Sequence, residues 1–310
     1  MNQLPLIYHP TTLYWIDDDS LFLNIAADCF KENYAIKTST SPNEAKNFFD
    51  GYQSHIDLSI FLRGCDEHED YDLTDHLPID LDFNAIRQVH NSSNKLKDIA
   101  VMIVDYRMPD MSGIDLCTQL STVPTKKILL TGDANFQDAI NAFNKGIINY
   151  FVCKDDPNID MILFENVDRL SKEYFIDRTK PIFHHIESDS KLPHSDPVFI
   201  NFVNKLCKEQ NIKEYYLSDK NGGILLVDVN GKLSYLVVHT DRTLNNFVDL
   251  HGKDGEATFF VKSVINRNKI PFFGVGKAMW GPEAVSWRDY FYTPKILEGR
   301  EKYYWILVSL

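Results

Sequence analysis

Residues 99–113, IAVMIVDYRMPDMSG, decide the fold that we predict for the first part of this chain. Ile99–Val104 is an unbroken apolar run rich in β-branched residues, which is typical of a central strand buried on both faces of a parallel sheet. The run ends at Asp105, and the following loop leads into a helix predicted over Ser112–Leu120. An acidic side chain at the carboxyl end of a parallel strand lies where open α/β sheets bind ligands.

Short apolar runs alternate with amphipathic stretches on both sides of this segment. The other predicted strands are Thr12–Ile16, Ala35–Thr38, Lys127–Leu130 and Ile148–Val152. The other predicted helices are Ser20–Phe30, Pro42–Phe49, Asn135–Asn144 and a last helix that begins near Pro157. Five strand-then-helix units in order predict an α/β domain, with a parallel sheet covered by helices on both faces.

Between Gly51 and Asp98 the chain is much longer than a tight crossover requires. Residues 64–82 alone contain eight acids: Asp66, Glu67, Glu69, Asp70, Asp72, Asp75, Asp80 and Asp82. Loops of this length are functional or solvated and disordered. We favour a solvated acidic loop followed by a helix near Phe83–His90, and the alternative is a docking surface for a basic partner.

Polar side chains follow four of the predicted strands, at the point where each strand ends. Asp17, Asp18 and Asp19 follow the first strand, and Asp105 follows the third. The fourth strand ends at Thr131, and Lys154 lies just after the fifth. Because the carboxyl ends of parallel strands meet at one edge of a sheet, we expect these groups to converge there.

Convergence of these groups would suit phosphoryl transfer. Crowded carboxylates repel one another unless a cation holds them, and oxygen ligands favour a hard ion such as Mg²⁺. A carboxylate can act as the nucleophile toward phosphorus, while a metal and a lysine neutralise the charge on the transferring group. A nearby hydroxyl can then hydrogen-bond to the product. Each residue alone fits a solvated loop or a surface position, and the signal lies in the combination.

The motifs WIDDD (15–19), VDYRMPDMSG (104–113), LLTGD (129–133) and YFVCK (150–154) resemble those of bacterial response regulator receiver domains. The resemblance implies a flavodoxin-like five-stranded domain that is phosphorylated on Asp105 with Mg²⁺. It makes Asp17 and Asp18 the acidic pair, with Asp18, Asp105 and the carbonyl of Arg107 as metal ligands. It makes Thr131 the switch hydroxyl, Lys154 the phosphate-binding cation and Phe151 the aromatic switch.

The same resemblance implies a sensor histidine kinase or phosphotransfer protein as partner, and a homodimer linked to phosphorylation. Self-phosphotransfer and autodephosphorylation are then the only expected chemistry. The chain departs from the family at Asp155, where a proline usually follows the lysine, and Arg107 and Asp133 are unusual beside the acceptor. The acidic insertion and an output region without a recognised DNA-binding helix pair are similar to response regulators of Legionella-type (Lqs) quorum-sensing circuits.

Charge and composition argue against several other classes. Residues 1–180 hold 16 Lys and Arg against 29 Asp and Glu, a balance of −13, and the remainder of the chain carries +1. Nucleic-acid binding needs a clustered basic face, which neither half offers. No apolar run approaches the length of a membrane span, and the first residues do not resemble a secretory signal, so we expect a cytoplasmic protein. Five scattered cysteines predict reduced thiols.

The second half predicts a different architecture. Residues 178–197 contain three prolines and little periodicity, so we predict a linker in which His184, His185 and His194 are solvated. A helix over Pro197–Glu209 and strands over Ile212–Leu217, Ile224–Val229 and Lys232–Val238 follow. Gly222-Gly223 and Asn230-Gly231 indicate hairpin turns. Helices over Thr243–Leu250 and Ala257–Asn268 and a last strand, Tyr303–Val308, complete the set.

These patterns divide the chain into three parts. The first is an acceptor domain over residues 1–177, which contains the insertion at about 51–98. A linker over 178–197 follows, and the last part is an α+β output domain over 198–310 with an antiparallel sheet. His239 lies in an H-x-x-R-T sequence, for which we expect a structural or capping role at a strand end. Gly274-Val275-Gly276-Lys277 lacks the frame of a phosphate loop and predicts a turn. Aromatic residues are concentrated near the end of the chain. We expect them to build the core of the output domain, and the alternative is that they line a ligand pocket or a partner surface. They are Trp280, Trp287, Tyr290, Phe291, Tyr292, Tyr303, Tyr304 and Trp305.

Two hypotheses for the output domain follow. In the first, phosphorylation of Asp105 switches dimerisation or the binding of a protein or small molecule. In the second, phosphorylation gates an enzyme, or a nucleotide- or nucleic-acid-processing activity, in residues 198–310. The second hypothesis requires convergent acids, and the carboxylates of that region are dispersed along the sequence.

Overall fold

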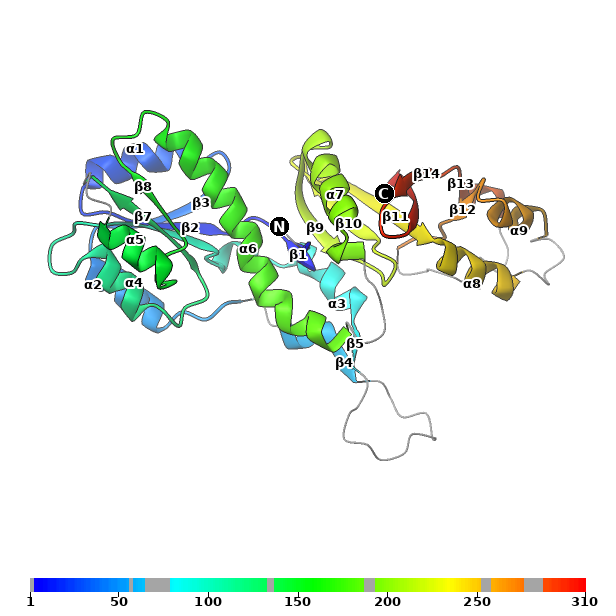
Figure 1. Cartoon of the computed structure of the whole chain (residues 1–310), viewed down its shortest axis with the longest axis horizontal. Coiled ribbons are helices and arrows are strands. Elements are labelled where there is room, and N and C mark those ends of the chain that lie inside the picture. The colour runs from blue at the N-terminus through cyan, green and yellow to red at the C-terminus, as the bar shows by residue number, and fades with distance from the viewer. Residues whose placement is uncertain are drawn as a thin grey trace. The chain divides into compact units, whose positions relative to one another are not determined.

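The computed structural model describes residues 3–55, 58–64, 79–132, 137–186, 193–251, 258–275 and 287–310. The chain divides into two compact units. We call Pro10–Leu58 and Ser92–Arg178 the parallel unit, and Met1–His9, Ser59–Asn91 and Thr179–Leu310 the antiparallel unit. Figure 1 shows the elements of both units along the chain.

The parallel unit contains the predicted five-stranded sheet, in the order β3-β2-β6-β7-β8. Its strands are β2 (Thr12–Ile16), β3 (Ala35–Ser39), β6 (Val101–Asp105), β7 (Lys126–Thr131) and β8 (Tyr150–Cys153). All four neighbouring pairs are parallel. This strand order is the flavodoxin-like arrangement, so the predicted fold class is confirmed.

Helices cover both faces of this sheet (Figure 1). Side chains from α2 (Pro42–Asp50), α4 (Gly113–Gln119) and α5 (Gln137–Asn144) share one buried core with alternate residues of β2, β6 and β7. On the other face, α1 (Ser20–Phe30) and α6 (Ile159–Ile186) pack together, with the rings of Phe30 and Phe164 stacked at 4.9 Å. Covering both faces explains why the Ile99–Val104 run is apolar without alternation.

Short polar side chains begin three of these helices. Asp19 accepts hydrogen bonds from the first backbone N–H groups of α1, Ser41 caps α2, and Ser112 caps α4. Such caps satisfy donors that have no partner inside the helix. Asp19 therefore has a structural role at the start of α1, although it stands beside the two acids of the predicted site.

The antiparallel unit is built on a six-stranded sheet in the order β1-β9-β10-β11-β15-β14. Its strands are β1 (Ile7–Tyr8), β9 (Ile212–Leu217), β10 (Ile224–Asp228), β11 (Leu233–Thr240), β14 (Lys295–Glu298) and β15 (Lys302–Ser309). Both predicted hairpin turns are present, with Gly222 and Gly231 at φ values of 94° and 77°. The predicted α+β output architecture with an antiparallel sheet is thus confirmed.

Helix α7 (Pro197–Glu209) has the predicted bounds and packs its apolar side chains into the core of this sheet. Two further helices, α8 (Asp241–His251) and α9 (Thr258–Ile265), follow β11 close to their predicted positions. A small pair of strands, β12 (Ile270–Pro271) and β13 (Phe291–Tyr292), was not predicted. Two-residue strands give too little alternation for a sequence signal.

Residues 3–9 join the antiparallel unit, although they were predicted to lie in the acceptor domain. Ile7 pairs with Tyr216, and Tyr8 stacks on Tyr215 at 5.5 Å. Leu4, Leu6 and Ile7 are fully buried. This short apolar run forms an edge strand of the sheet and pairs with β9, which lies far along the chain. No local pattern predicts such a pairing.

The predicted linker also differs from the structure. Helix α6 continues through residues 178–186, with Thr179 and Ile182 buried on it. The prediction that His194 is solvated is wrong, since its side chain is 1% exposed. It lies against Phe199, and burial lowers the pKa of His194 to about 4. The side chains of His184 and His185 lie outside the described residues.

The insertion contains ordered elements at both ends. Strands β4 (Leu62–Gly64) and β5 (Ile79–Leu81) pair, and α3 (Phe83–Gln88) confirms the helix predicted near Phe83–His90. Arg87 donates a hydrogen bond to the carbonyl oxygen of Ser218 at 2.7 Å, so this helix belongs to the antiparallel unit. Residues 65–78, which hold most of the acids, lie outside the described residues. The choice between a solvated loop and a docking surface therefore stays a prediction.

In the described part of the chain, every helix is too short or too polar to cross a membrane.

Candidate functional site

Three carboxylates meet at the carboxyl edge of the parallel sheet. Asp17 and Asp18 directly follow β2, and Asp105 is the last residue of β6. Each offers an oxygen within 4.8 Å of the other two. Asp17 and Asp105 are 1% and 4% exposed, whereas Asp18 is exposed. The adjacent parallel strands β2 and β6 bring the acids together, as their positions at the strand ends predicted.

Lys154 closes this cluster from the end of β8. Its ammonium lies 2.6 Å from Oδ2 of Asp17 and 2.7 Å from Oδ1 of Asp105. The Lys154 backbone N–H donates to the carbonyl oxygen of Thr131, which fixes the segment beside β7. The bond between Lys154 and Asp155 is trans, as are the other described peptide bonds. Replacement of the usual proline by Asp155 therefore does not keep the ammonium away from the carboxylates.

Burial and charge act in opposite directions in this cluster. Burial raises the pKa of Asp105 above its ordinary value, although the hydrogen bond and charge of Lys154 act to lower it. Burial lowers the pKa of Lys154, but hydrogen bonds to Asp105 and Asp17 outweigh this and raise it overall. One ammonium faces three carboxylates, so the cluster keeps an excess of negative charge that a divalent cation would neutralise.

The loop after Asp105 holds its carboxylate in place. The backbone N–H of Arg107 donates to Oδ2 of Asp105 at 2.8 Å, and the N–H of Gly113 donates to the carbonyl oxygen of Tyr106 at 2.9 Å. A Cβ atom on Gly113 would lie 2.1 Å from the carbonyl oxygen of Asp105. This close approach requires glycine, which accounts for the glycine that ends the quoted stretch.

Thr131 is the last residue of β7, and Phe151 lies inside β8, where it pairs with Leu129. Thr131 is buried and follows Leu130, which pairs with Asp105 across the sheet. Phe151 is half-buried, with its ring 6.3 Å from that of Phe143 on α5. The structure thus brings Asp17, Asp18, Asp105 and Lys154 together, and Thr131 ends the strand next to that of Asp105. Asp133, which follows Thr131 closely, lies outside the described residues.

Residues 82–161 match the response regulator receiver domain family. The chain contains a response regulator receiver domain. The structure of the Legionella pneumophila response regulator LqsR aligns with a TM-score of 0.80 and 26% identity, covering 99% of this chain and 89% of that one. The resemblance drawn from the motifs, including the finer one to the Lqs type, is confirmed.

Other solved structures match only part of the chain. An uncharacterized protein from Neptuniibacter caesariensis aligns with a TM-score of 0.38 and 20% identity, covering 56% of this chain and 95% of that one. A CheY-like receiver domain protein from Methanospirillum hungatei aligns with a TM-score of 0.33 and 15% identity, covering 53% and 96%. No curated protein sequence matches this chain.

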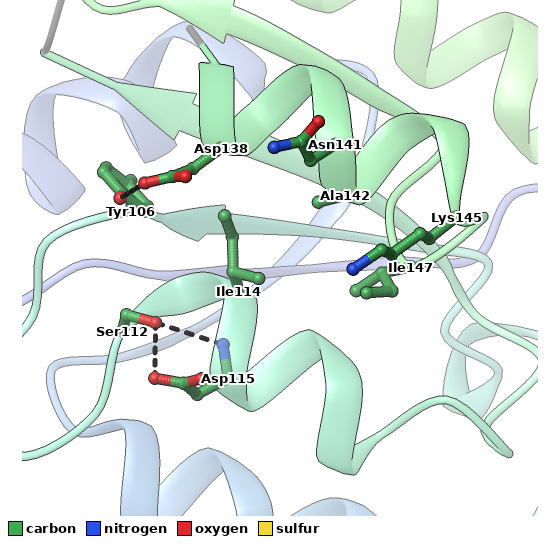
Figure 2. A pocket seen from close by; sticks show the side chains of 9 residues that line it. All are labelled: Tyr106, Ser112, Ile114, Asp115, Asp138, Asn141, Ala142, Lys145 and Ile147. Atoms are coloured by element: carbon green, nitrogen blue, oxygen red, sulfur yellow. Dashed lines mark hydrogen bonds between the residues drawn. The ribbon is translucent and has the colours of Figure 1, made fainter. Parts of the chain in front are cut away.

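A pocket of about 310 Å³ opens between α4 and α5 of the receiver domain (Figure 2). The hydroxyl of Tyr106 donates to Oδ2 of Asp138 at 2.8 Å and so ties the acceptor loop to the first turn of α5. Asp105 and Lys154 do not line it. We therefore place the chemistry at the carboxylate cluster and regard this pocket as a groove between helices.

Phe22 is a site residue that the sequence analysis missed. It lies in the first turns of α1, and its ring centroid is 4.6 Å from the ammonium of Lys154. The ring also makes an edge contact with Trp15 at 6.2 Å. Phe22 lies three residues after the capping residue Asp19, so its position in the first turn of the helix that follows the acids is the signal that would have found it.

The three signals predicted in the output domain are structural where they are described. His239 is buried at the end of β11, with Nε2 2.9 Å from the carbonyl oxygen of Pro271, which confirms its structural role. Gly274 has a φ of 115°, as a turn requires, but Gly276 and Lys277 lie outside the described residues. Tyr303 and Trp305 belong to the hydrophobic core of the sheet, while Trp280 and the side chain of Trp287 are not described.

Proposed function

We propose that Asp105 accepts a phosphoryl group from a sensor histidine kinase or a phosphotransfer protein, and that the phosphorylated receiver domain switches dimerisation or partner binding. The observation that carries the proposal is the position of Lys154. Its ammonium bridges Asp17 and Asp105 at hydrogen-bond distance, on the edge of the sheet where the acceptor strand ends. A cation held there is ready to bind the oxygens of an incoming phosphoryl group.

In the proposed transfer, a carboxylate oxygen of Asp105 attacks the phosphorus atom of a phosphohistidine. The new P–O bond forms as the P–N bond breaks, and the imidazole nitrogen keeps the electron pair. The backbone N–H of Arg107, 2.8 Å from Oδ2 of Asp105, holds the carboxylate in one orientation during the attack. Lys154 then donates to an oxygen of the bound phosphoryl group, and the Thr131 hydroxyl donates to another.

The donor set suits Mg²⁺. Asp17, Asp18 and Asp105 offer oxygens within 4.8 Å of one another, and the carbonyl of Arg107 follows the acceptor by two residues. Oxygen-only ligands and an excess of negative charge match a hard divalent ion. When bound, Mg²⁺ supplies positive charge to the phosphoryl oxygens.

The switch acts through the residues beside the phosphoryl group. Thr131 moves toward the new phosphoryl oxygens, and Phe151 turns into the space it leaves, which alters the surface formed by α5 and the first part of α6. Phe151 already contacts Phe143 on α5, and Phe143 is 47% exposed. Phosphorylation only biases two states that exist beforehand, so the affinity difference between the states sets the size of the response.

The output domain, predicted over residues 198–310, then transmits the change without a helix-turn-helix. Binding of a protein or small molecule fits this region better than catalysis. Metal-dependent catalysis would need convergent acids. Among the described residues, the cluster of three side chains that could hold a metal ion lies in the receiver domain. By analogy with the Lqs type, we place this switch in a cytoplasmic quorum-sensing relay.

Intact mass spectrometry tests the proposal. The full chain, incubated with acetyl phosphate and Mg²⁺, is expected to gain one phosphoryl group, and chelation of Mg²⁺ should prevent the gain. Asp105→Asn should remove the label, whereas Asp110→Asn, which changes a nearby carboxylate outside the cluster, should keep it. Labelling that persists in Asp105→Asn would assign the acceptor to another residue. Size-exclusion chromatography with light scattering, with and without beryllofluoride, tests the dimer.

A further inference from the structure

A second pocket, of about 590 Å³, lies at the opposite end of the receiver sheet from Asp105. Its walls include Thr12 at the start of β2, Lys37 on β3 and Ile99 just before β6. We call it the basal pocket. Its volume falls within the range of roughly 300–1,000 Å³ that is usual for small-molecule sites. Phosphoryl transfer at Asp105 does not use it.

One wall of the basal pocket is aromatic and rigid. The ring of Phe48 stacks on Tyr14 at 5.2 Å and lies 6.0 Å from Tyr52. The hydroxyl of Tyr52 accepts a hydrogen bond from the backbone N–H of Ile99 at 2.8 Å. The hydroxyl is therefore occupied, and the Tyr52 ring lines the pocket beside that of Phe48.

The charge of the basal pocket is opposite to that of the unit around it. Lys37, His55 and Lys97 line the pocket, and none of its described lining residues is a carboxylate. The parallel unit, residues 10–58 and 92–178, holds 13 Lys and Arg against 21 Asp and Glu, a balance of −8, so its composition does not explain two lysines and a histidine in one pocket. Burial raises the pKa of Tyr52, so its hydroxyl stays neutral and adds no negative charge to the wall.

The positive charge of Lys37 lies directly against the aromatic wall. Its ammonium lies 3.7 Å from the ring centroid of Phe48, a cation–π contact that holds the charge at the wall. Asp98 lies between the lining residues Lys97 and Ile99 without lining the pocket itself. Its Oδ1 accepts hydrogen bonds from Ser54 and from the backbone of His55, which fixes the segment that carries His55.

We propose that the basal pocket binds a planar aromatic anion, with its ring among the apolar and aromatic side chains that line the pocket and its anionic group on Lys37 and Lys97. The site is independent of phosphorylation at Asp105. The chain enters the parallel unit at Pro10, leaves it after Leu58 and re-enters it at Ser92. The lining residues Thr12, His55 and Leu96 lie close to these three points. Ligand binding therefore acts on the segments that lead out of the receiver domain.

Isothermal titration calorimetry of the full chain with 2-naphthoate, 2-naphthamide and hexanoate tests the proposal. These probes are an aromatic anion, its neutral counterpart and an anion without an aromatic ring. We expect 2-naphthoate to bind at least tenfold more tightly than either of the others. Lys37→Gln and Lys97→Gln should each weaken 2-naphthoate binding by roughly three- to tenfold, since each removes a charged hydrogen-bond donor.

Lys46→Gln is the matched control, because Lys46 is also a lysine on the same unit but does not line the basal pocket. It should leave the affinity unchanged. The double variant Lys37→Gln, Lys97→Gln should lose binding while keeping the wild-type circular dichroism and thermal midpoint. Equal affinity for 2-naphthoate and 2-naphthamide, unchanged binding by the double variant, or no binding of 2-naphthoate at millimolar concentration would each overturn the proposal.

Discussion

The ammonium of Lys154 lies 4.6 Å from the ring centroid of Phe22 while it contacts Asp17 and Asp105. The aromatic face thus supports the cation from one side, and the carboxylates hold it from the other. Cation–π contacts contribute about 0.5–2 kcal/mol, depending on how far the pair is desolvated. In a chain with Asp155 where a proline usually follows the lysine, Phe22 provides an additional restraint on the cation.

Phe22→Leu is therefore expected to slow phosphorylation of Asp105. Loss of about 0.5–2 kcal/mol corresponds to a decrease of roughly 2- to 30-fold in the labelling rate with acetyl phosphate. Phe22→Tyr keeps an aromatic face and should label at a rate close to wild type. Equal rates for the leucine and wild-type chains would show that the ring does not position Lys154.

Gly113→Ala should destabilise the receiver domain by about 1–3 kcal/mol, because the new Cβ atom would lie 2.1 Å from the carbonyl oxygen of Asp105. The loop must move, so the labelling rate should also decrease. Gly51→Ala is the control, since a Cβ atom there meets nothing within 4 Å. Urea unfolding measures both variants, and a Gly113→Ala chain as stable as Gly51→Ala would contradict the predicted clash.

The buried His194 should make stability depend on pH. Its folded-state pKa of about 4 lies below the ordinary value of 6.5, so the unfolded chain binds the proton more readily. Stability from the neutral imidazole is present above pH 6.5 and is lost as the pH falls toward 4. Between pH 7 and pH 5 this loss amounts to about 2 kcal/mol.

The measurement is the difference between wild type and His194→Gln in urea unfolding at the two pH values. Glutamine stays neutral throughout, so the variant should lose about 2 kcal/mol less than wild type on going from pH 7 to pH 5. Identical pH dependence in the two chains would mean that His194 is protonated without a cost in the folded state.

Asp98→Ala should cost roughly 1–3 kcal/mol of stability. Asp98 is fully buried, and its Oδ1 accepts from the Ser54 hydroxyl at 2.9 Å and from the His55 backbone N–H at 2.7 Å. Removal of the carboxylate takes a hydrogen bond from each of these part-buried donors and leaves a cavity at a buried position. Asp50→Ala, at an exposed carboxylate, should change stability by no more than about 0.5 kcal/mol. Equal effects of the two substitutions would contradict this role for Asp98.

Much of the receiver domain followed from local patterns. Each strand-then-helix unit has its own apolar period, and Asp19, Ser41 and Ser112 mark helix starts within a few residues of the helices they cap. The site was predictable for the same reason. Parallel strands bring their carboxyl ends to one edge, so the order of Asp17, Asp105, Thr131 and Lys154 along the chain was enough to place them together.

Other features depend on residues that are distant in sequence. Phe22 was missed because its role depends on the path of Lys154 across the sheet, 132 positions later in the chain. The basal pocket was missed because Lys37, His55 and Lys97 lie on three separate segments with no shared motif. His194 stands among prolines and polar residues, and only packing against Phe199 makes it a buried residue.

The sequence by itself determined the five strand-then-helix units, their parallel order and the edge at which the acidic residues meet, because period, caps and strand ends are local properties. Tertiary structure alone decided that residues 3–9 and the described elements β4, β5 and α3 of the insertion join the antiparallel unit, through pairing of Ile7 with Tyr216 and contact of Arg87 with Ser218. Hydrogen bonds and burial between distant segments have no local signature, because they depend on where the rest of the chain has folded.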